Sequence, residues 1–376
     1  MKKLLTVAAI FLAISLLCGC GCGWGQKPAT GKKLIKVGVL SSLTGKTMAY
    51  GQSAQEGLEI ALAEVNKDYD FNIKLIYEDT QSQPKEAVSA ANKLISIDNV
   101  SLIVGPILSD ETLAVAPIAE SKKRVLLTPV ASAEDITKAG DFIFRLREGG
   151  SIHGKGAADF IYKKLNIKSS AILFANATNS ITYKDGFENH FRSLGGEIIY
   201  SEGYLPGSAD FKTSLSKIKV LNPDALYFSP NNSADFIQAI QQIRELNINT
   251  AIVTNPFAET PGVTETLGQQ ANDIVYTYPY FNPEEDTGLT FDKKLQAMYN
   301  KKSDIFAAYS YDALKILAIA IDKCGGDNSE CVKTELYKIK DYQGAGGNTS
   351  FDENGDAVKS VMLKTVRNGQ FVKYEE

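Results

Sequence analysis

Few residues in this 376-residue chain could carry out acid–base or metal chemistry. Histidine occurs only at His153 and His190, and the chain contains no His-x-x-x-His or Cys-x-x-Cys pair. A zinc site or a Ser/His hydrolase site is normally built from such side chains. We therefore expect no metal, no cofactor and no catalytic site, and we interpret each histidine as a surface or helix-end residue.

The charge of the chain argues against nucleic acid as a partner. There are 40 basic and 44 acidic residues, giving a net charge of −4, whereas a phosphate backbone is bound by a basic face. The segment from Leu40 to Thr47 ends in Gly-Lys-Thr like a phosphate-binding loop, but Leu40 stands where that loop needs its first glycine. Nucleotide binding is therefore not expected either.

The N-terminus has the pattern of a bacterial export signal. Lys2 and Lys3 precede an apolar stretch over 4–17, which is too short to cross a membrane and suits the core of a signal peptide. The residues that follow resemble a lipobox, in which a small residue precedes the cysteine that becomes lipidated, and Cys20 fits best. We expect 1–19 to be a signal peptide and 20–33 a lipid anchor and flexible tether, with plain secretion as the alternative.

Two further cysteines lie close together near the end of the chain. Cys324 and Cys331 flank a turn-rich Gly-Gly-Asp-Asn-Ser-Glu segment between two helical stretches. In an oxidising compartment two such thiols can pair. We predict a disulfide here, and two free thiols that cap helix ends are the alternative.

Short apolar runs alternate with amphipathic helical segments over most of the chain. Segment 52–65 repeats apolar residues at helical spacing, and 84–97 has a proline in its first turn. This alternation predicts parallel sheets with helices on both faces, and the number of strands predicts two α/β lobes. The last third differs, with three helices and then a β-hairpin over 357–374. The expected strands are 35–40, 73–77, 101–104, 125–128, 142–144, 170–174, 197–200, 225–228, 251–254 and 274–276, and the expected late helices are 289–300, 306–321 and 331–339.

Several short motifs, taken in order, resemble those of a known family. They include the strand over 35–40, Gly105-Pro106, the run over 128–132 (Thr-Pro-Val-Ala-Ser) and 351–356 (Phe-Asp-Glu-Asn-Gly-Asp). From residue 34 onward the chain resembles the type I periplasmic solute-binding proteins, and among them the branched-chain amino-acid (Leu/Ile/Val) receptors of ABC transporters. The resemblance implies two Rossmann-like lobes with parallel central sheets, joined by a three-strand hinge. The lobes would be 34–148 plus 280–345 for lobe 1, and 149–279 plus 346–376 for lobe 2.

Small polar residues follow the strands expected in lobe 1, at the sheet edge where ligands of open α/β sheets bind. Ser109 stands just before a predicted helix, so its hydroxyl and nearby backbone N–H groups could hold a carboxylate; a simple N-cap is the alternative. The resemblance implies that the Val130 carbonyl and Ser132 hold the α-ammonium and carboxylate of a ligand. It also implies a pocket walled by three tyrosines, and asparagines at strand ends of lobe 2 should face the cleft unless they only form turns: Tyr50, Tyr183 and Tyr311, with Asn176 and Asn231 or Asn232.

The chain departs from the branched-chain pattern at the acid that pairs with the ligand ammonium. Pro256 takes that place, the nearest acid is Glu259, and Glu148 lies in the region of a second family acid that is also absent. A buried ammonium without a carboxylate partner is costly. We therefore expect either that Glu259 or Glu148 holds the ammonium or that the ligand lacks one. In the second case three aromatic side chains favour an aromatic or purely carboxylic ligand: Phe257, Tyr278 and Tyr280.

These observations together predict an extracytoplasmic solute-binding lipoprotein, held at a membrane by its lipid. It would capture an amino acid or a related small carboxylate by hinge closure and deliver it, as a monomer, to the permease of an ABC transporter. A sensory receptor of the same fold, coupled to a membrane signalling protein, is the alternative. An extracytoplasmic hydrolase is a weaker one, because the chain offers no evident nucleophile–base pair.

Overall fold

The computed structural model describes residues 31–260, 262–284 and 286–375. The expected signal peptide, the expected lipidation of Cys20 and most of the expected tether therefore lie outside the described residues. Within the described part of the chain, no helix has both the length and the apolar character needed to cross a membrane. The body of the protein begins at Lys33.

The first sheet, called sheet A here, has five strands that are all parallel, in the order β2-β1-β3-β4-β5. Its three short strands, at the centre and at the β5 edge, are buried along their whole length, as expected for a parallel sheet covered on both faces. All five strands fall where the alternation of apolar runs predicts them. Their bounds are β1 (Lys33–Ser41), β2 (Phe71–Asp79), β3 (Leu102–Val104), β4 (Val125–Thr128) and β5 (Ile143–Arg145).

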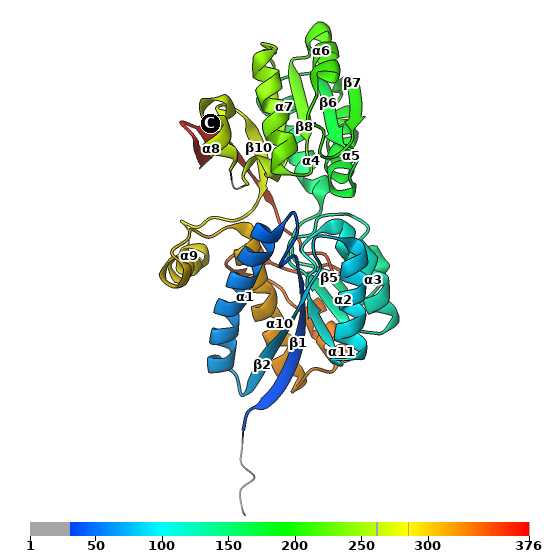
Figure 1. The fold of residues 1–376 in the computed structure, drawn as a ribbon, viewed down its shortest axis with the longest axis vertical. Helices are drawn as coiled ribbons and strands as arrows, with labels where there is room; N and C mark the ends of the chain where they lie inside the picture. The colour runs from blue at the N-terminus through cyan, green and yellow to red at the C-terminus, as the bar shows by residue number, and fades with distance from the viewer. Residues whose placement is uncertain (1–30, 261, 285, 376) are drawn as a thin grey trace, which may run out of the picture. The chain divides into compact units, whose positions relative to one another are not determined.

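Successive strand residues point to opposite faces of sheet A, and the apolar side chains on both faces are buried by helices. Leu102 and Leu127 pack in the hydrophobic cluster that includes α1 (Met48–Asp68) and α10 (Ile305–Cys324). Ile103 and Leu126 pack in a separate cluster with α2 and α3. Figure 1 shows α1 and α10 on one side of the strands and α2 and α3 on the other. The remaining helices of this part are α2 (Pro84–Ser96), α3 (Ser109–Ser121), α9 (Asp286–Tyr299) and α11 (Ser329–Tyr337).

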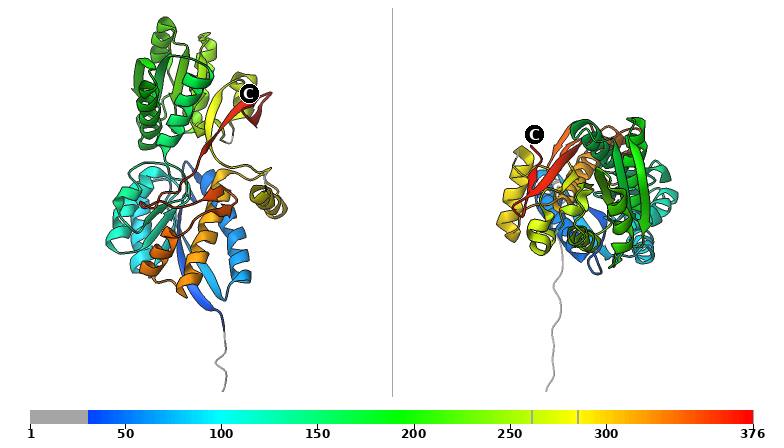
Figure 2. Two further views of the ribbon diagram at one scale, coloured as in Figure 1. Left: turned by 180° about the vertical axis from the view of Figure 1, so that it is seen from behind. Right: turned by 90° about the horizontal axis from the view of Figure 1, so that it is seen from above.

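The second sheet, sheet B, has seven strands in the order β14-β13-β10-β9-β8-β6-β7. Strands β6 to β10 are parallel, whereas β13 runs antiparallel to β10 and forms a hairpin with β14. The C-terminal strands, red in Figure 2, lie beside β10. The strands are β6 (Ser169–Ala175), β7 (Glu197–Tyr204), β8 (Ala225–Ser229), β9 (Ala251–Thr254), β10 (Val275–Pro279), β13 (Val361–Arg367) and β14 (Gln370–Lys373), and the helices of this part are α4 (Gly150–Asp159), α5 (Thr178–Ser193), α6 (Lys212–Leu221), α7 (Ser233–Glu245) and α8 (Val263–Leu267).

The chain passes between the elements of the two sheets three times, after β5, after β10 and before β13. The lobe boundaries remain predictions, and contacts near the last passage bear on them. Strand β12 (Gly347–Thr349) pairs with β11 (Tyr342–Gly344), and the Asp356 carboxylate accepts a hydrogen bond from Nε of Arg145 at 2.7 Å. These contacts favour a last passage after residue 356 rather than near residue 346.

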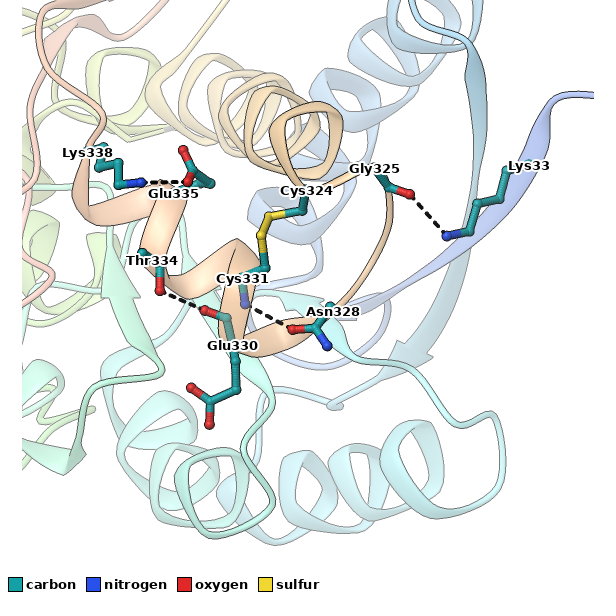
Figure 3. Close-up of a disulfide and its surroundings, with 9 residues drawn as sticks. All are labelled: Lys33, Cys324, Gly325, Asn328, Glu330, Cys331, Thr334, Glu335 and Lys338. Atoms are coloured by element: carbon teal, nitrogen blue, oxygen red, sulfur yellow. Dashed lines mark hydrogen bonds and ion pairs between the residues drawn. A yellow bond between two sulfur atoms is a disulfide. The ribbon is translucent and has the colours of Figure 1, made fainter.

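The two late cysteines form a disulfide that links the end of α10 to α11 (Figure 3). The turn between them begins at Gly325, whose φ of 62° lies in the left-handed region that glycine adopts without strain. The Asn328 side chain then caps α11 by accepting a hydrogen bond from the backbone N–H of Cys331 at 3.0 Å. The disulfide therefore fixes a helix–turn–helix corner beside sheet A.

Candidate functional site

One pocket gathers most of the residues predicted to bind a ligand. Loops that follow β3, β4 and β5 contribute to it, together with the start of α5, the short 3₁₀ helix η3 (Pro256–Ala258) and the start of α10. Seven predicted site residues line it, while their role as ligand contacts stays a prediction. The full lining is Tyr50, Ile107, Leu108, Ser109, Val130, Ala131, Ser132, Arg147, Asn179, Tyr183, Pro256, Phe257, Glu259, Thr260, Ile305 and Phe306.

Ser109 joins the two loops that carry the polar end of the pocket. Its Oγ accepts hydrogen bonds from the backbone N–H groups of Ser132 and Ala133, each at 3.2 Å. Ser109 is the first residue of α3, whose N-cap is Leu108, so the alternative of a simple serine N-cap is wrong. Because its oxygen already accepts two bonds, the Ser109 hydroxyl has its own hydrogen left to donate to a ligand.

A close backbone approach allows the loop before Ser109 to reach this position. Gly105 follows β3 with a φ of +94°, and a Cβ at this residue would lie 2.1 Å from the carbonyl oxygen of Leu40. Only glycine permits this approach between the ends of β3 and β1. The Gly105-Pro106 motif seen in the sequence therefore places Ser109 at the carboxyl edge of sheet A.

Aromatic rings form the apolar walls of the pocket. The Tyr50 ring stacks on Phe306 with a centroid separation of 4.4 Å and an interplanar angle of 3°. Burial raises the pKa of Tyr50, although hydrogen bonds to Ser233 and Thr260 oppose the shift, so its hydroxyl stays protonated at neutral pH. Tyr183 is buried, and its hydroxyl donates a hydrogen bond to Oγ of Ser132 at 3.3 Å.

Arg147, which is not among the predicted site residues, brings a positive charge into this pocket. Its guanidinium donates to the carbonyl oxygen of Val130 at 3.3 Å and to the hydroxyl of Tyr183 at 2.8 Å. Nε lies 3.7 Å from Oε1 of Glu148, and no hydrogen-bond partner of this buried Nε is found. The residue is 7% exposed, follows β5 by two residues and lines the pocket.

A buried acid–histidine pair lies next to Arg147. Glu148 and His153 are buried, with His153 Nε2 and Glu148 Oε1 2.6 Å apart. Burial would raise the pKa of Glu148, but the hydrogen bond from His153 and the charges of His153, Arg147 and Lys359 lower it to about 2. Burial lowers the pKa of His153, although the hydrogen bond and the charge of Glu148 oppose this shift. The expectation of a surface histidine is therefore wrong for His153, which lies in the first turn of α4 but is part of a buried network.

Glu259 lies in the pocket lining, but its carboxylate is already bonded. Oε1 accepts from Nζ of Lys364 at 2.6 Å, Oε2 lies 2.5 Å from the same nitrogen, and the Tyr276 hydroxyl donates to Oε2 at 2.5 Å. Both partners come from sheet B, where Tyr276 is in β10 and Lys364 in β13. The charge of Glu259 is therefore compensated within the protein.

Three other predicted residues lie outside this pocket. Tyr311 is wrong as a pocket wall, because α10 turns it toward α1, where its hydroxyl donates to Glu64 at 2.7 Å and its ring packs on Phe291. Asn176 is wrong as well, because it packs against Gly203 at the end of the neighbouring strand. Asn231 and Asn232 both line an adjoining hollow that shares Tyr50, Ser109 and Phe257 with the pocket, and Asn232 also caps α7.

The aromatic residues at the end of sheet B also lie away from the pocket. Tyr278 is buried in β10 and is absent from the pocket lining. Tyr280 lines a different hollow near β11 and β12. Of the three aromatic residues expected to favour an aromatic ligand, Phe257 alone faces the pocket. Within the described residues, no three His, Cys, Asp or Glu side chains gather as metal ligands would.

Comparisons with known proteins agree on one family. The family model described as periplasmic binding protein matches residues 34–370. The Leu/Ile/Val-binding protein BraC3 of Rhizobium johnstonii is 26% identical, with 91% of this chain and 94% of that protein covered. Among solved structures, a leucine binding protein LivK from Thermotoga maritima is 28% identical with a TM-score of 0.83, over 91% of this chain and 98% of the other. The substrate binding protein LivJ of a Streptococcus pneumoniae branched-chain amino acid transporter, in complex with isoleucine, is 29% identical with a TM-score of 0.82, over 90% and 98% of the two chains.

Proposed function

Because this chain belongs to the periplasmic binding protein family, we propose that it is an extracytoplasmic receptor for an amino acid or a related small carboxylate. The observation that carries the proposal is the pocket itself, in which Ser109 and the start of α3 face aromatic walls. Polar donors at one end and apolar walls around the rest are typical of a site for a small ligand with one charged end. The proposed receptor hands its ligand to the permease of an ABC transporter.

The polar end of the pocket suits a carboxylate. The first turn of α3 presents backbone N–H groups that have no partner inside the helix, and the helix dipole favours negative charge there. The Ser109 hydroxyl adds a side-chain donor beside them. The isoleucine complex of the similar LivJ protein supports a ligand of this size and class.

Hinge closure is the proposed mechanism. The lining combines residues that follow strands of sheet A, such as Ser109 and Ser132, with residues that follow strands of sheet B, such as Phe257. A ligand that touches both sets stabilises the closed form, because its contacts with the second set form only on closure. A permease that recognises the closed form would then bind only receptors that carry a ligand. No covalent step is involved.

Ligand screening tests this proposal directly. The purified protein is heated with each member of a panel of amino acids, aromatic and aliphatic monocarboxylates, dicarboxylates and amides, and the melting temperature is recorded. A true ligand raises the melting temperature by mass action, by an amount that grows with its concentration. The hits are then measured by calorimetry, with micromolar or tighter dissociation constants expected. A panel without a single stabilising compound, or a ligand that the protein converts to product, would overturn the proposal.

A further inference from the structure

We infer that the pocket selects a small monocarboxylate with an apolar or aromatic body and no α-ammonium group, and that Arg147 is the residue that sets this preference. The inference rests on the proposed function, because it concerns the ligand of the same pocket. It differs from the ligands named for the similar LivK and LivJ proteins, which are amino acids. Three features of the pocket carry it.

The first feature is that the hydrogen-bond acceptors an ammonium group would need already accept bonds within the protein. The carbonyl of Val130 accepts from Arg147, and Oγ of Ser132 accepts from Tyr183. Oγ of Ser109 accepts from two backbone N–H groups, and both carboxylate oxygens of Glu259 are bonded to Lys364 and Tyr276. An ammonium group carries three N–H donors, and it would have to share these oxygens with the donors they already serve.

The second feature is the charge that faces the pocket. Glu259 and Arg147 are the charged residues of the lining, and Glu259 is bonded to Lys364 at 2.5–2.6 Å, whereas Nε of Arg147 lies 3.7 Å from Glu148, beyond hydrogen-bond distance. Glu148, the acid closest to Arg147, stands behind it and is absent from the lining. A ligand ammonium beside this guanidinium would meet a like charge at low dielectric, whereas a carboxylate would meet an opposite one.

The third feature is a set of N–H and O–H donors around the pocket. Arg147 lines the pocket, and its guanidinium carries five N–H donors. The Ser109 hydroxyl has its hydrogen to donate, and the first turn of α3 adds backbone N–H groups. A guanidinium beside a helix N-terminus suits a carboxylate. The stacked pair Tyr50–Phe306 and the ring of Phe257 then surround an apolar or aromatic body.

The acids Asp110 and Glu111 do not supply a partner for a ligand ammonium in the pocket. They line the adjoining hollow and not the pocket, and Lys46 lines the same hollow. Glu111 is buried with no hydrogen bond found at either oxygen, and burial raises its pKa to about 7. It is therefore a poor ammonium partner, since much of it is neutral near pH 7.

Matched pairs of ligands test the inference by calorimetry on the purified protein. Leucine is compared with 4-methylpentanoate, and phenylalanine with 3-phenylpropanoate, so that each pair differs only in the α-ammonium group. We expect the acid without the ammonium to bind at least tenfold more tightly in at least one pair. If the amino acid binds equally or more tightly in both pairs, the inference fails while the proposed function stands. If no compound of the wider panel binds, both fail.

Substitutions locate the preference at Arg147. Arg147→Gln should weaken carboxylate binding at least tenfold, and it should bring the dissociation constants of the amino acid and the matching monocarboxylate closer together. Arg147→Lys should keep part of the preference for the monocarboxylate. Glu259→Gln should not weaken carboxylate binding, because the Glu259 side chain is bonded to Lys364 and Tyr276 and is not the partner of the ligand; loss of amino-acid binding in this variant would instead identify Glu259 as the ammonium partner and overturn the inference. Tyr311→Phe is the matched control, because Tyr311 contacts Glu64 away from the pocket. Circular dichroism of each variant checks that it is folded.

Discussion

At the scale of single residues, Ser109 is the group whose contribution to binding is most directly testable. It joins the loops after β3 and β4 and keeps one hydrogen for a ligand. Ser109→Ala should weaken binding of the carboxylate roughly tenfold, because a hydrogen bond to a charged group contributes about 1.5 kcal/mol or more. Calorimetry with the best ligand of the panel measures this change. Ser89→Ala, on the exposed face of α2, is the control and should bind as the parent does; equal affinities for the two variants would count against Ser109 as a contact.

The buried pair Glu148–His153 predicts how stability depends on pH. The pKa of His153 is lowered in the folded state. Below about pH 6.5 this histidine therefore binds a proton more readily in the unfolded chain than in the folded chain. Stability therefore falls on acidification, by up to about 1.4 kcal/mol per pH unit for one such group. Melting temperatures at pH 7.5 and 5.5 should show a smaller acid-induced drop in His153→Gln than in the parent. An equal drop in both proteins would exclude His153 as a source of this dependence.

The residue scale also shows what sequence reasoning could find and what it could not. Ser109 and Ser132 could be placed at the edge of sheet A because each follows an apolar run that was expected to be a strand, and the structure has β3 and β4 there. Arg147 was missed, since a charged residue after a strand normally faces solvent, and its partners Val130 and Tyr183 are far away in the sequence. Tyr311 was misplaced because its position was carried over from the family resemblance, and helical periodicity could not correct it, since α10 is buried on nearly all sides.

At the scale of secondary-structure elements, the disulfide predicts a local effect on stability. It closes a short loop between α10 and α11, with seven residues of sequence separation. Replacing both cysteines by serine should lower the free energy of unfolding by about 2–3 kcal/mol, mainly because the unfolded chain gains freedom. Urea unfolding measures this change. Ligand affinity should stay the same, because neither cysteine lines the pocket; a changed affinity would show that the corner is coupled to the site.

Element boundaries were predictable where local pattern decides them. The parallel strands of both sheets appear as short apolar runs between amphipathic helices, and the structure places them there. The C-terminal hairpin begins at Val361 and not near 357, because Ala357 bridges to Phe351 and the N–H of Val358 donates to the carbonyl of Ser350. That pairing depends on how residues before the hairpin fold back, which no local pattern reveals.

At the scale of the whole molecule, the arrangement expected for a tethered receptor depends on Cys20, which precedes the folded body at Lys33 by a short glycine-containing segment. A lipid on Cys20 would hold the pocket near the membrane and raise its effective concentration at a permease. In the parent we expect a mature N-terminus at Cys20 that carries the mass of the lipid, and recovery of the protein in the membrane fraction.

Substitution of each N-terminal cysteine separates this expectation from plain secretion. Cys20→Ser should remove the lipid and move the protein to the soluble extracytoplasmic fraction, whereas Cys18→Ser and Cys22→Ser should remain lipidated. The affinity for the ligand should be equal in all four proteins, because the pocket is built from residues of the body. Ligand uptake by cells should nevertheless fall for Cys20→Ser, since the released receptor loses its local concentration at the membrane. An unmodified N-terminus downstream of Cys20 in the parent would exclude the lipid anchor and leave secretion of a free receptor.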